Sequence, residues 1–477
     1  MRRLARVAAV LPLLAGCMVG PDYRRPEVEV PPAWAPVPPW QPARPDDAAA
    51  RGPWWAIFGD ARLDALEGEA LAHSPTLAAA GERLVQARAL ASAASAALLP
   101  QAALDAGGAR ERTSANRPLA SYALPNSSTV QDDFTAGFTV RYEPDLFGGL
   151  RRQAQAARAA AEQAQAGVES ARLVLAAELA ADYFNLRELD RETDIVEQNI
   201  VAQRQALDFV RNRRDIGVAS GLDLAQAQAQ LDATTTQADL LRVQRAQVEH
   251  AIATLVARPA PGFAIEPQTR APAVPPVPVG IPAQVLQRRP DVASAERAMA
   301  AANERIGVAR SAYFPGITLA SGYGVESNHL SDLFRAASNL WSLGVSAAQV
   351  LFDGGIIAAN VDFAQADYRA AVDAYRQTVL AAMQEVEDGM TGTAYLASAA
   401  AKAQAAVKSA QRVAELANDR YAGGLANYLD VITAEQALLA NQRQQAQING
   451  QQMVTTVYLV KALGGGWAAP DGPTARN

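Results

Sequence analysis

The sequence predicts a mainly α-helical chain with a small amount of membrane β structure, built from two copies of one unit. Three observations support this fold class. The composition is 50% hydrophobic but only 6% aromatic, with much alanine, a combination that favours long helices in close contact. Proline and glycine landmarks of the first half recur in the second. Short segments of alternating polarity occur in both halves.

The first 16 residues predict a secretory signal peptide. Three arginines precede an apolar stretch over residues 7–15, which is too short to cross a bilayer as a helix. The run Leu14-Ala15-Gly16-Cys17 resembles a bacterial lipobox. We therefore expect Cys17 to become the lipidated N-terminus and to tether the chain to a membrane. Residue 18 is Met rather than Asp, which is compatible with delivery to the outer membrane of a Gram-negative bacterium.

Proline-rich stretches suggest how the mature chain is divided. Residues 17–60 are expected to form an extended strap. A second proline-rich stretch, 257–282, ends a first repeat that we place at 61–282. The second repeat is placed at 283–463, followed by a C-terminal tail, 464–477.

The duplication can be checked by subtraction. Pro75 and Pro100 bracket a helical stretch, and Pro290 and Pro315 bracket another; 290 − 75 and 315 − 100 are both 215. Two further matched landmarks are Phe147 with Phe352 (352 − 147 = 205) and Asp223 with Asp430 (430 − 223 = 207). Landmarks in one order at similar offsets indicate an internal repeat.

In order, each repeat is expected to contain a helix, two strands, a very long helix, a sharp turn and a return helix. The long helices are placed at about 150–216 and 356–422, roughly 100 Å each at 1.5 Å per residue. The turns are placed at 217–223 and 423–430. From Leu224 to Leu255, the residues expected to face a neighbouring helix recur at intervals of three and four positions, which is the coiled-coil period.

Four strands are expected at about 101–112, 133–143, 316–326 and 340–350. Alternation separates an apolar face, with Phe138 as an example, from a polar one. A membrane sheet cannot keep an open edge, and a closed barrel needs about eight strands. Several copies must therefore share one barrel, and three copies would give twelve strands continued by a helical tube.

Several function classes are excluded by composition. A net charge of −6 supplies no basic footprint for nucleic acid. One cysteine forbids an internal disulfide and a multi-cysteine metal cluster. The three histidines lack the spacing of metal ligands. We expect no metal, no cofactor and no enzymatic activity.

Six motifs carry a family resemblance: Gly20-Pro-Asp-Tyr-Arg-Arg-Pro-Glu27, Trp54-Trp55 with Phe58, Arg288-Arg-Pro-Asp-Val292, Ala301-Ala-Asn303 to Ile306-Gly307, Tyr313-Phe-Pro315 and Leu351-Phe-Asp-Gly-Gly355. They resemble NodT-type outer membrane factors, the lipoprotein relatives of TolC, over nearly the whole mature chain. The resemblance implies a homotrimer with a 12-stranded barrel in outer membrane lipid and a long periplasmic α-helical barrel. It also implies an exit duct for drugs or other toxic solutes, joined by a periplasmic adaptor to an RND inner membrane pump.

The resemblance further implies a periplasmic gate at the turns. Asp430 and Asp223 match acidic positions near the family's gate, where symmetry-related carboxylates would narrow the entrance. Helix capping is an alternative role for both, and the better one for Asp223. Tyr421 matches a tyrosine that ties neighbouring helices. The arginine that works with that tyrosine in TolC falls on Ala426 here, so the closing contacts must differ.

The turn residues are the candidates for contact with the adaptor: Gly217, Val218, Ala219, Gly424, Leu425 and Ala426. Small and apolar side chains allow close contact between helix ends, although ordinary turns have the same composition. Two other functions stay open at this point. One is a duct for type I protein secretion, and the other is a periplasmic coiled-coil lipoprotein without a pore.

Overall fold

The computed structural model describes residues 18–26, 53–116, 128–269, 273–277, 285–286 and 288–465. The chain divides into two compact units. The sheet unit comprises Met1–Pro26, Arg83–Ala164 and Ala295–Tyr375, and the helix unit comprises Glu27–Glu82, Gln165–Ser294 and Arg376–Asn477. Each unit takes segments from both repeats, so the compact units do not follow the repeat boundaries. The expected signal peptide and Cys17 lie outside the described residues.

Equal helix lengths confirm the internal duplication. The matched pairs are α3 (Pro75–Ala96) with α7 (Pro290–Ser311), α4 (Gly149–Asp215) with α8 (Ile356–Ala422), and α5 (Gly221–Leu255) with α9 (Tyr428–Ala462). Their lengths are 22, 67 and 35 residues in both halves. Their starts differ by 290 − 75 = 215, 356 − 149 = 207 and 428 − 221 = 207. Before α3, the first half also has η2 (Trp54–Phe58) and α2 (Ala61–His73).

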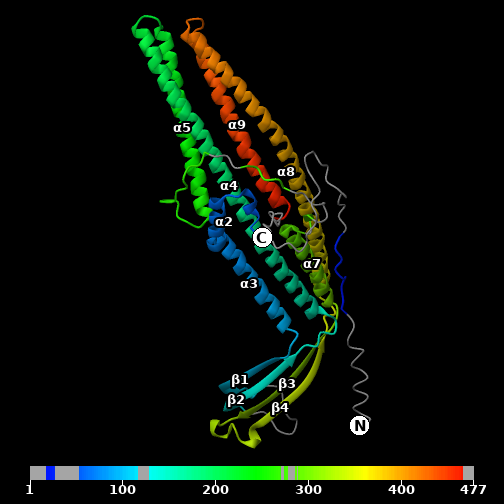
Figure 1. Cartoon of the computed structure of the whole chain (residues 1–477). Coiled ribbons are helices and arrows are strands. Elements are labelled where there is room, and N and C mark those ends of the chain that lie inside the picture. Colours follow the sequence, from blue (N-terminus) through cyan, green and yellow to red (C-terminus); the bar gives the residue numbers. More distant parts are fainter. Residues whose placement is uncertain are drawn as a thin grey trace, which may run out of the picture. The chain divides into compact units, whose positions relative to one another are not determined.

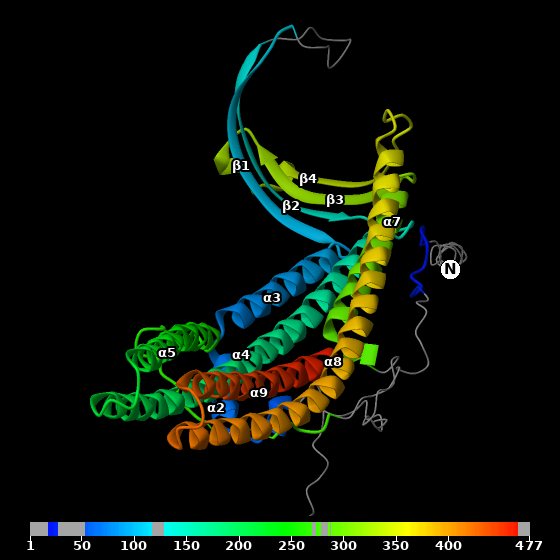
Figure 2. The same cartoon turned by 90° about the horizontal axis from the view of Figure 1, so that it is seen from above.

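Four antiparallel strands form one sheet in the order β1-β2-β3-β4 (Figure 1). They are β1 (Gln101–Thr113), β2 (Thr129–Tyr142), β3 (Gly316–Ser327) and β4 (Asn339–Ala348). Two short 3₁₀ helices, η3 (Leu330–Asp332) and η4 (Ala336–Ser338), lie between β3 and β4 in the chain. The strand β2 begins before the expected residue 133 because Thr129 pairs with Thr113, at the end of the β1–β2 ladder. The strand β4 ends at Ala348, before the expected residue 350. The strands are strongly curved (Figure 2).

One face of the sheet is apolar and exposed. The register places Leu104 opposite Phe138, Phe138 opposite Tyr323, and Tyr323 opposite Trp341, so a single apolar row crosses all four strands. Even the least exposed of the four side chains, Phe138, is 48% exposed in the isolated chain. The opposite face carries small and polar residues, including Asp105 with Thr139, whose side chains are hydrogen-bonded at 3.4 Å. An apolar outer face over a polar inner one is the pattern of a membrane barrel wall.

The helix unit has its main apolar core around α2, α4 and the end of α9. Its largest fully buried side chains include Tyr183, Phe184, Leu63 and Leu459. Beside it, the buried Asp190 carboxylate accepts hydrogen bonds from Arg187 and Arg245, each at 2.7 Å. It also accepts the backbone N–H of Gln268 at 2.9 Å. This network fixes the proline-rich segment that follows α5 against the helices.

In the part of the chain that the structure describes, no helix combines the length and the apolar character needed to cross a membrane.

Candidate functional site

The reversal from α4 to α5 depends on Gly217, whose φ of 78° is in the left-handed region. The N–H groups of Val218 and Ala219 donate to the carbonyl of Arg213, at 2.8 and 3.1 Å. This arrangement ends α4 as a glycine-terminated helix and satisfies its last carbonyls. The sequence therefore builds a tight turn rather than a loop.

The reversal from α8 to α9 repeats the same chemistry. Gly424 has a φ of 75°, and the N–H of Leu425 donates to the carbonyl of Arg420 at 2.8 Å. Each pair of matched turn residues is again 207 apart (424 − 217 = 207). Figure 1 shows the two turns at neighbouring ends of the helix unit, where α4 meets α5 and α8 meets α9.

The two aspartates after the turns have different surroundings. Asp223 belongs to a capping box: its N–H donates to the Ser220 hydroxyl at 3.1 Å, and its carboxylate accepts the Ser220 N–H at 2.9 Å. The N–H of Asp430 donates to the Asn427 side chain at 2.9 Å. Among the described residues the exposed Asp430 carboxylate has no hydrogen-bond or ion-pair partner. The geometry thus gives Asp223 a capping role and leaves the Asp430 carboxylate available.

Tyr421 is buried where two helical hairpins meet, one formed by α4 and α5 and the other by α8 and α9. Its ring packs at 5.1 Å from the ring of Tyr428 and 6.5 Å from that of Phe209. Burial and the nearby carboxylate of Asp223 raise the pKa of Tyr421, although Arg213 opposes them. Burial, together with the negative charge of Glu435, raises the pKa of Tyr428 to about 12. Both tyrosines are therefore neutral at physiological pH.

Arg213 is the residue that sequence reasoning missed at this site. Its guanidinium lies 5.1 Å from the ring centroid of Tyr421 and 5.6 Å from that of Phe209. It also donates to the carbonyl of Ala422 at 3.2 Å. Arg213 thus supplies a cation beside Tyr421 from the other repeat, whereas the position expected to supply it carries Ala426. The available signal was an arginine in the last turn of α4, which helix-end electrostatics alone would explain.

A shared apolar cluster holds the two turns together. Its buried members are Leu207, Val210, Ala227, Tyr421, Tyr428, Val431 and Ile432. They come from α4, α5, α8 and α9, so both hairpins are anchored to one another just behind the turns. Movement of one hairpin must disturb the packing of the other.

The outer surface of the turns is apolar and exposed. Of the expected contact residues, Val218 and Leu425 are 59% and 74% exposed, whereas Ala219 and Ala426 are half-buried. Three more exposed apolar side chains extend the surface: Ile216, Leu222 and Leu429. We call these five exposed residues, Ile216, Val218, Leu222, Leu425 and Leu429, the turn surface. An exposed apolar group of this kind marks an interaction site.

The residues that follow Cys17 are fixed to the sheet unit. Val19 donates its N–H to the carbonyl of Phe147 at 3.1 Å. The buried guanidinium of Arg152 contacts Glu304 at 2.8 Å and Asp22 at 3.2 Å. A Cβ on Gly20 would lie 2.7 Å from the Cα of Gly307, so the strap and α7 touch backbone to backbone. The described residues contain no group of three or more metal-ligating side chains.

An exposed apolar sheet face, long paired helices and capped helix turns define a TolC-like outer membrane channel. Residues 66–258 and 281–465 match the outer membrane efflux protein family. The chain belongs to that family. Among relatives, cation efflux system protein CusC of Escherichia coli is 30% identical over 462 residues, covering 95% of this chain and 96% of that protein. Toluene efflux pump outer membrane protein TtgF of Pseudomonas putida is 29% identical over 465 residues, with 95% of both covered.

The solved structure of the outer-membrane channel OprN matches with a TM-score of 0.86 and 29% identity, covering 94% of this chain and 100% of that chain. The resemblance to outer membrane factors is confirmed. The protein is an outer membrane exit duct of tripartite efflux, a role that is not enzymatic. The four-stranded sheet of each chain is consistent with a barrel shared by three copies.

Proposed function

We propose that three copies of this chain form one duct that passes drugs or other toxic solutes from an RND pump, through a periplasmic adaptor, to the exterior. The observation that carries the proposal is the four-stranded sheet with its apolar row Leu104, Phe138, Tyr323 and Trp341. Strands β1 and β4 form its edges in the described chain. Edges cannot stay open in a bilayer, and three sheets of four strands supply a closed ring of twelve.

The gate of this duct lies at the paired turns. The exposed Asp430 carboxylate, repeated by threefold symmetry, would form an acidic ring that attracts cations and narrows the entrance. Tyr421 and Arg213 would hold the two hairpins of each copy together while the entrance is closed. Asp223 contributes by capping α5 and thus by fixing the direction of the turn.

The adaptor docks on the turn surface. Its glycine-terminated turns are compact, so the exposed side chains of Val218 and Leu425 can enter the groove of a helical hairpin without steric hindrance from a loop. The half-buried Ala219 and Ala426 leave room for close approach. In this proposal, the glycines shape the turns and the apolar turn residues contact the adaptor.

Acylation of Cys17 would anchor each copy to the outer membrane. The fixed segment from Met18 supports this, because Val19 is hydrogen-bonded beside the start of α4, next to the end of β2. An acyl chain on Cys17 would therefore tether the sheet unit, to which the segment from Met18 is fixed. Mass spectrometry of the mature N-terminus would detect the acyl groups, and Cys17→Ser should abolish them.

Export and partner capture test the proposed function together. A strain without the gene should become more sensitive to toxic organic solutes, and the wild-type chain should restore resistance. Cross-linked adaptor and an RND pump should co-purify with the duct. Leu425→Asp should abolish binding of the adaptor without affecting outer membrane assembly. The control is Phe334→Asp, an equally drastic change at an exposed side chain between β3 and β4, which should leave binding of the adaptor unchanged. Recovery of a secreted protein and its ATP-driven transporter instead would favour type I secretion.

A further inference from the structure

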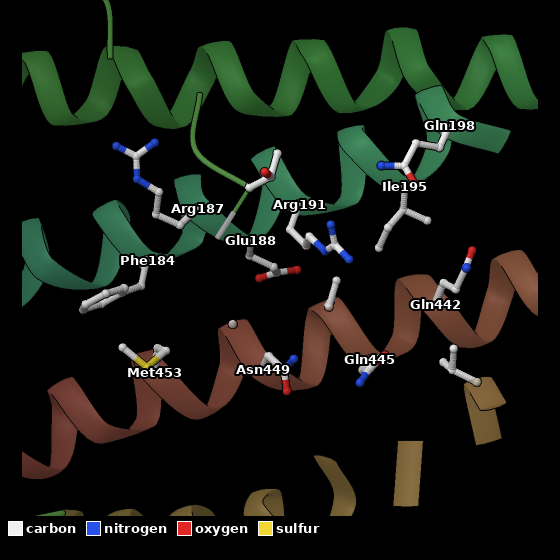
Figure 3. A pocket seen from close by; sticks show the side chains of 14 residues that line it. Phe184, Arg187, Glu188, Arg191, Ile195, Gln198, Gln442, Gln445, Asn449 and Met453 are labelled. Carbon is white, nitrogen blue, oxygen red and sulfur yellow. The ribbon is translucent and has the colours of Figure 1, made fainter. Parts of the chain in front are cut away.

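A cavity of about 390 Å³ lies in the helix unit, mainly between α4 and α9 (Figure 3). Its volume is within the range of about 300–1,000 Å³ that small-molecule sites occupy. It is distinct from the paired turns, since its lining on α9 runs from Gln442 to Met453, well beyond the turn residues 423–430. Its lining combines polar and apolar side chains.

Glu188 brings a carboxylate to the lining. Figure 3 shows its carboxylate directed from α4 into the space that faces α9. Among the described residues, Glu188 has no hydrogen-bond or ion-pair partner. The charged groups around it are engaged elsewhere: Arg187 with Asp190, Arg191 with Asp194, and Glu192 with Arg443. Within the described part of the chain, Glu188 is therefore a carboxyl group without a partner of opposite charge at a partly enclosed site.

Gly450 makes room for this carboxylate. A Cβ at that position would lie 2.6 Å from both Cγ and Oε2 of Glu188. Any other residue would push the carboxylate away from α9. One and five residues before it, Asn449 and Gln445 present half-buried carboxamides to the same cavity. Their oxygens can accept, and their amide groups can donate, hydrogen bonds.

Other parts of the lining are apolar. Phe184 and Met453 lie across from one another on α4 and α9, and Ile195 lies on the other side of Glu188 along α4 (Figure 3). Ala446 of α9 also belongs to the lining. An aromatic ring and a thioether provide polarisable surface for a flat ligand. As far as the structure describes the lining, the cavity thus offers a carboxylate, two carboxamides without a hydrogen-bond partner and several apolar side chains.

We propose that the α4–α9 cavity binds a small organic cation with a flat apolar body, such as a protonated aromatic amidine. The cation pairs with the Glu188 carboxylate, its remaining N–H groups donate to Asn449 and Gln445, and its apolar body packs on Phe184 and Met453. Because the ligand contacts both helices, it stabilises their packing. The proposal does not depend on what the duct exports.

The site also couples binding to pH. Burial, reinforced by the neighbouring Glu192 carboxylate, raises the pKa of Glu188 to about 7. The cavity lining on α9 is uncharged, and Val407 of α8 and Thr269 add no charge. The cations of the described lining, Arg187 and Arg191, are paired with Asp190 and Asp194. Below pH 7 a bound cation must displace a proton, so the affinity should fall by about tenfold for each pH unit.

The test uses the complete protein in mild detergent, with benzamidinium as the probe in isothermal titration calorimetry. At pH 8 we expect saturable binding at one site per chain, and at least tenfold weaker binding of neutral benzamide. Affinity for benzamidinium should fall as the pH is lowered from 7 to 6. Equal affinity for the two probes, or no binding of benzamidinium, would overturn the proposal.

Two substitutions locate the site. Glu188→Gln should remove the preference for the cation, and Gly450→Ala should weaken binding by pushing Glu188 aside. Glu197→Gln, on the exposed surface of α4, is the matched control and should bind as the wild type does. Unchanged binding by Glu188→Gln would contradict the assignment. If that variant does not assemble, the comparison of benzamidinium with benzamide across pH in the wild type decides the matter.

Discussion

The guanidinium of Arg213 lies 5.1 Å from the ring centroid of Tyr421 and links the hairpin of the first repeat to that of the second. The two residues are 208 positions apart in the chain (421 − 213 = 208). A hydrogen bond of 3.2 Å to the carbonyl of Ala422 fixes the same guanidinium at the end of α8. The contact between the two turns of one chain therefore involves a cation and an aromatic ring rather than a pair of opposite charges.

Replacement of Arg213 should loosen the entrance. Arg213→Ala removes a partly buried cation–π contact of about 1 kcal/mol and a hydrogen bond, so we expect at least a twofold rise in single-channel conductance in a planar bilayer. Arg213→Lys should have an intermediate effect, because lysine keeps the charge but not the planar group. Arg211→Ala, at an exposed position paired with Asp208, is the control. Equal conductance of all four proteins would show that Arg213 has only a packing role.

Substitution of the two aspartates should separate gating from capping. Asp223→Ala breaks a capping box and should lower the stability of the extracted protein by about 0.5–2 kcal/mol, with little change in ion selectivity. Asp430→Ala should raise conductance and reduce cation preference, with thermal stability nearly unchanged. Single-channel recording and thermal unfolding measure both properties. A large loss of stability with wild-type selectivity in Asp430→Ala would assign it to capping.

Strand pairing should be sensitive to one glycine and insensitive to another. A Cβ on Gly324 would lie 2.8 Å from the carbonyl oxygen of Ala136 and 2.9 Å from the Cα of Gly137, both in β2. We expect Gly324→Ala to lower the amount of assembled protein in the outer membrane several-fold. A Cβ on Gly316, also in β3, meets no atom within 4 Å, so Gly316→Ala should assemble normally. Immunoblots of unheated membrane fractions compare the two, and equal assembly would contradict the close approach of β2 and β3.

Glu67 should make stability fall as the pH rises. Burial, with Asp64 nearby, raises its pKa from 4.5 to about 9. Folded chains therefore keep a proton that unfolded chains release above pH 4.5. The stability that this proton contributes is complete below 4.5 and is lost progressively as the pH rises to about 9, by at most about 1.4 kcal/mol per pH unit.

Glu67→Gln should remove most of this pH dependence, since the carboxamide stays neutral in both states. Thermal unfolding of the extracted protein between pH 5 and pH 9 measures the slope. Glu82→Gln replaces an exposed glutamate on α3 and should keep the wild-type slope. A slope that is the same in Glu67→Gln would show that another group is responsible.

Much of the fold could be predicted because its signals are local and repeated. Pro75 and Pro290 begin α3 and α7, and both long helices end within two residues of the expected positions. Gly217 and Gly424 mark turns that need a positive φ. Strand alternation gave the correct apolar face, although not the full length of β2, because the start of a hairpin strand depends on its partner.

Contacts between distant helices could not be predicted. The sequence does not indicate that Arg213 lies on Tyr421 or that Glu188 rests against Gly450, since these pairs join segments more than 200 residues apart. The sequence favours capping for Asp223 but does not show the contact that decides it. The N–H of Ser220 donates to the Asp223 carboxylate, whereas the Asp430 carboxylate accepts no such hydrogen bond among the described residues. Local periodicity indicates which face of a helix is buried, but it does not indicate which side chains of other helices contact that face.

The most direct measurement is the native mass of the protein extracted from outer membranes in mild detergent, determined after the detergent has been removed in the mass spectrometer. A mass three times that of the mature, acylated chain is the expected result, because twelve strands then close the barrel around a continuous duct. A stable monomer would leave the edges β1 and β4 open and would contradict the shared barrel on which the duct depends.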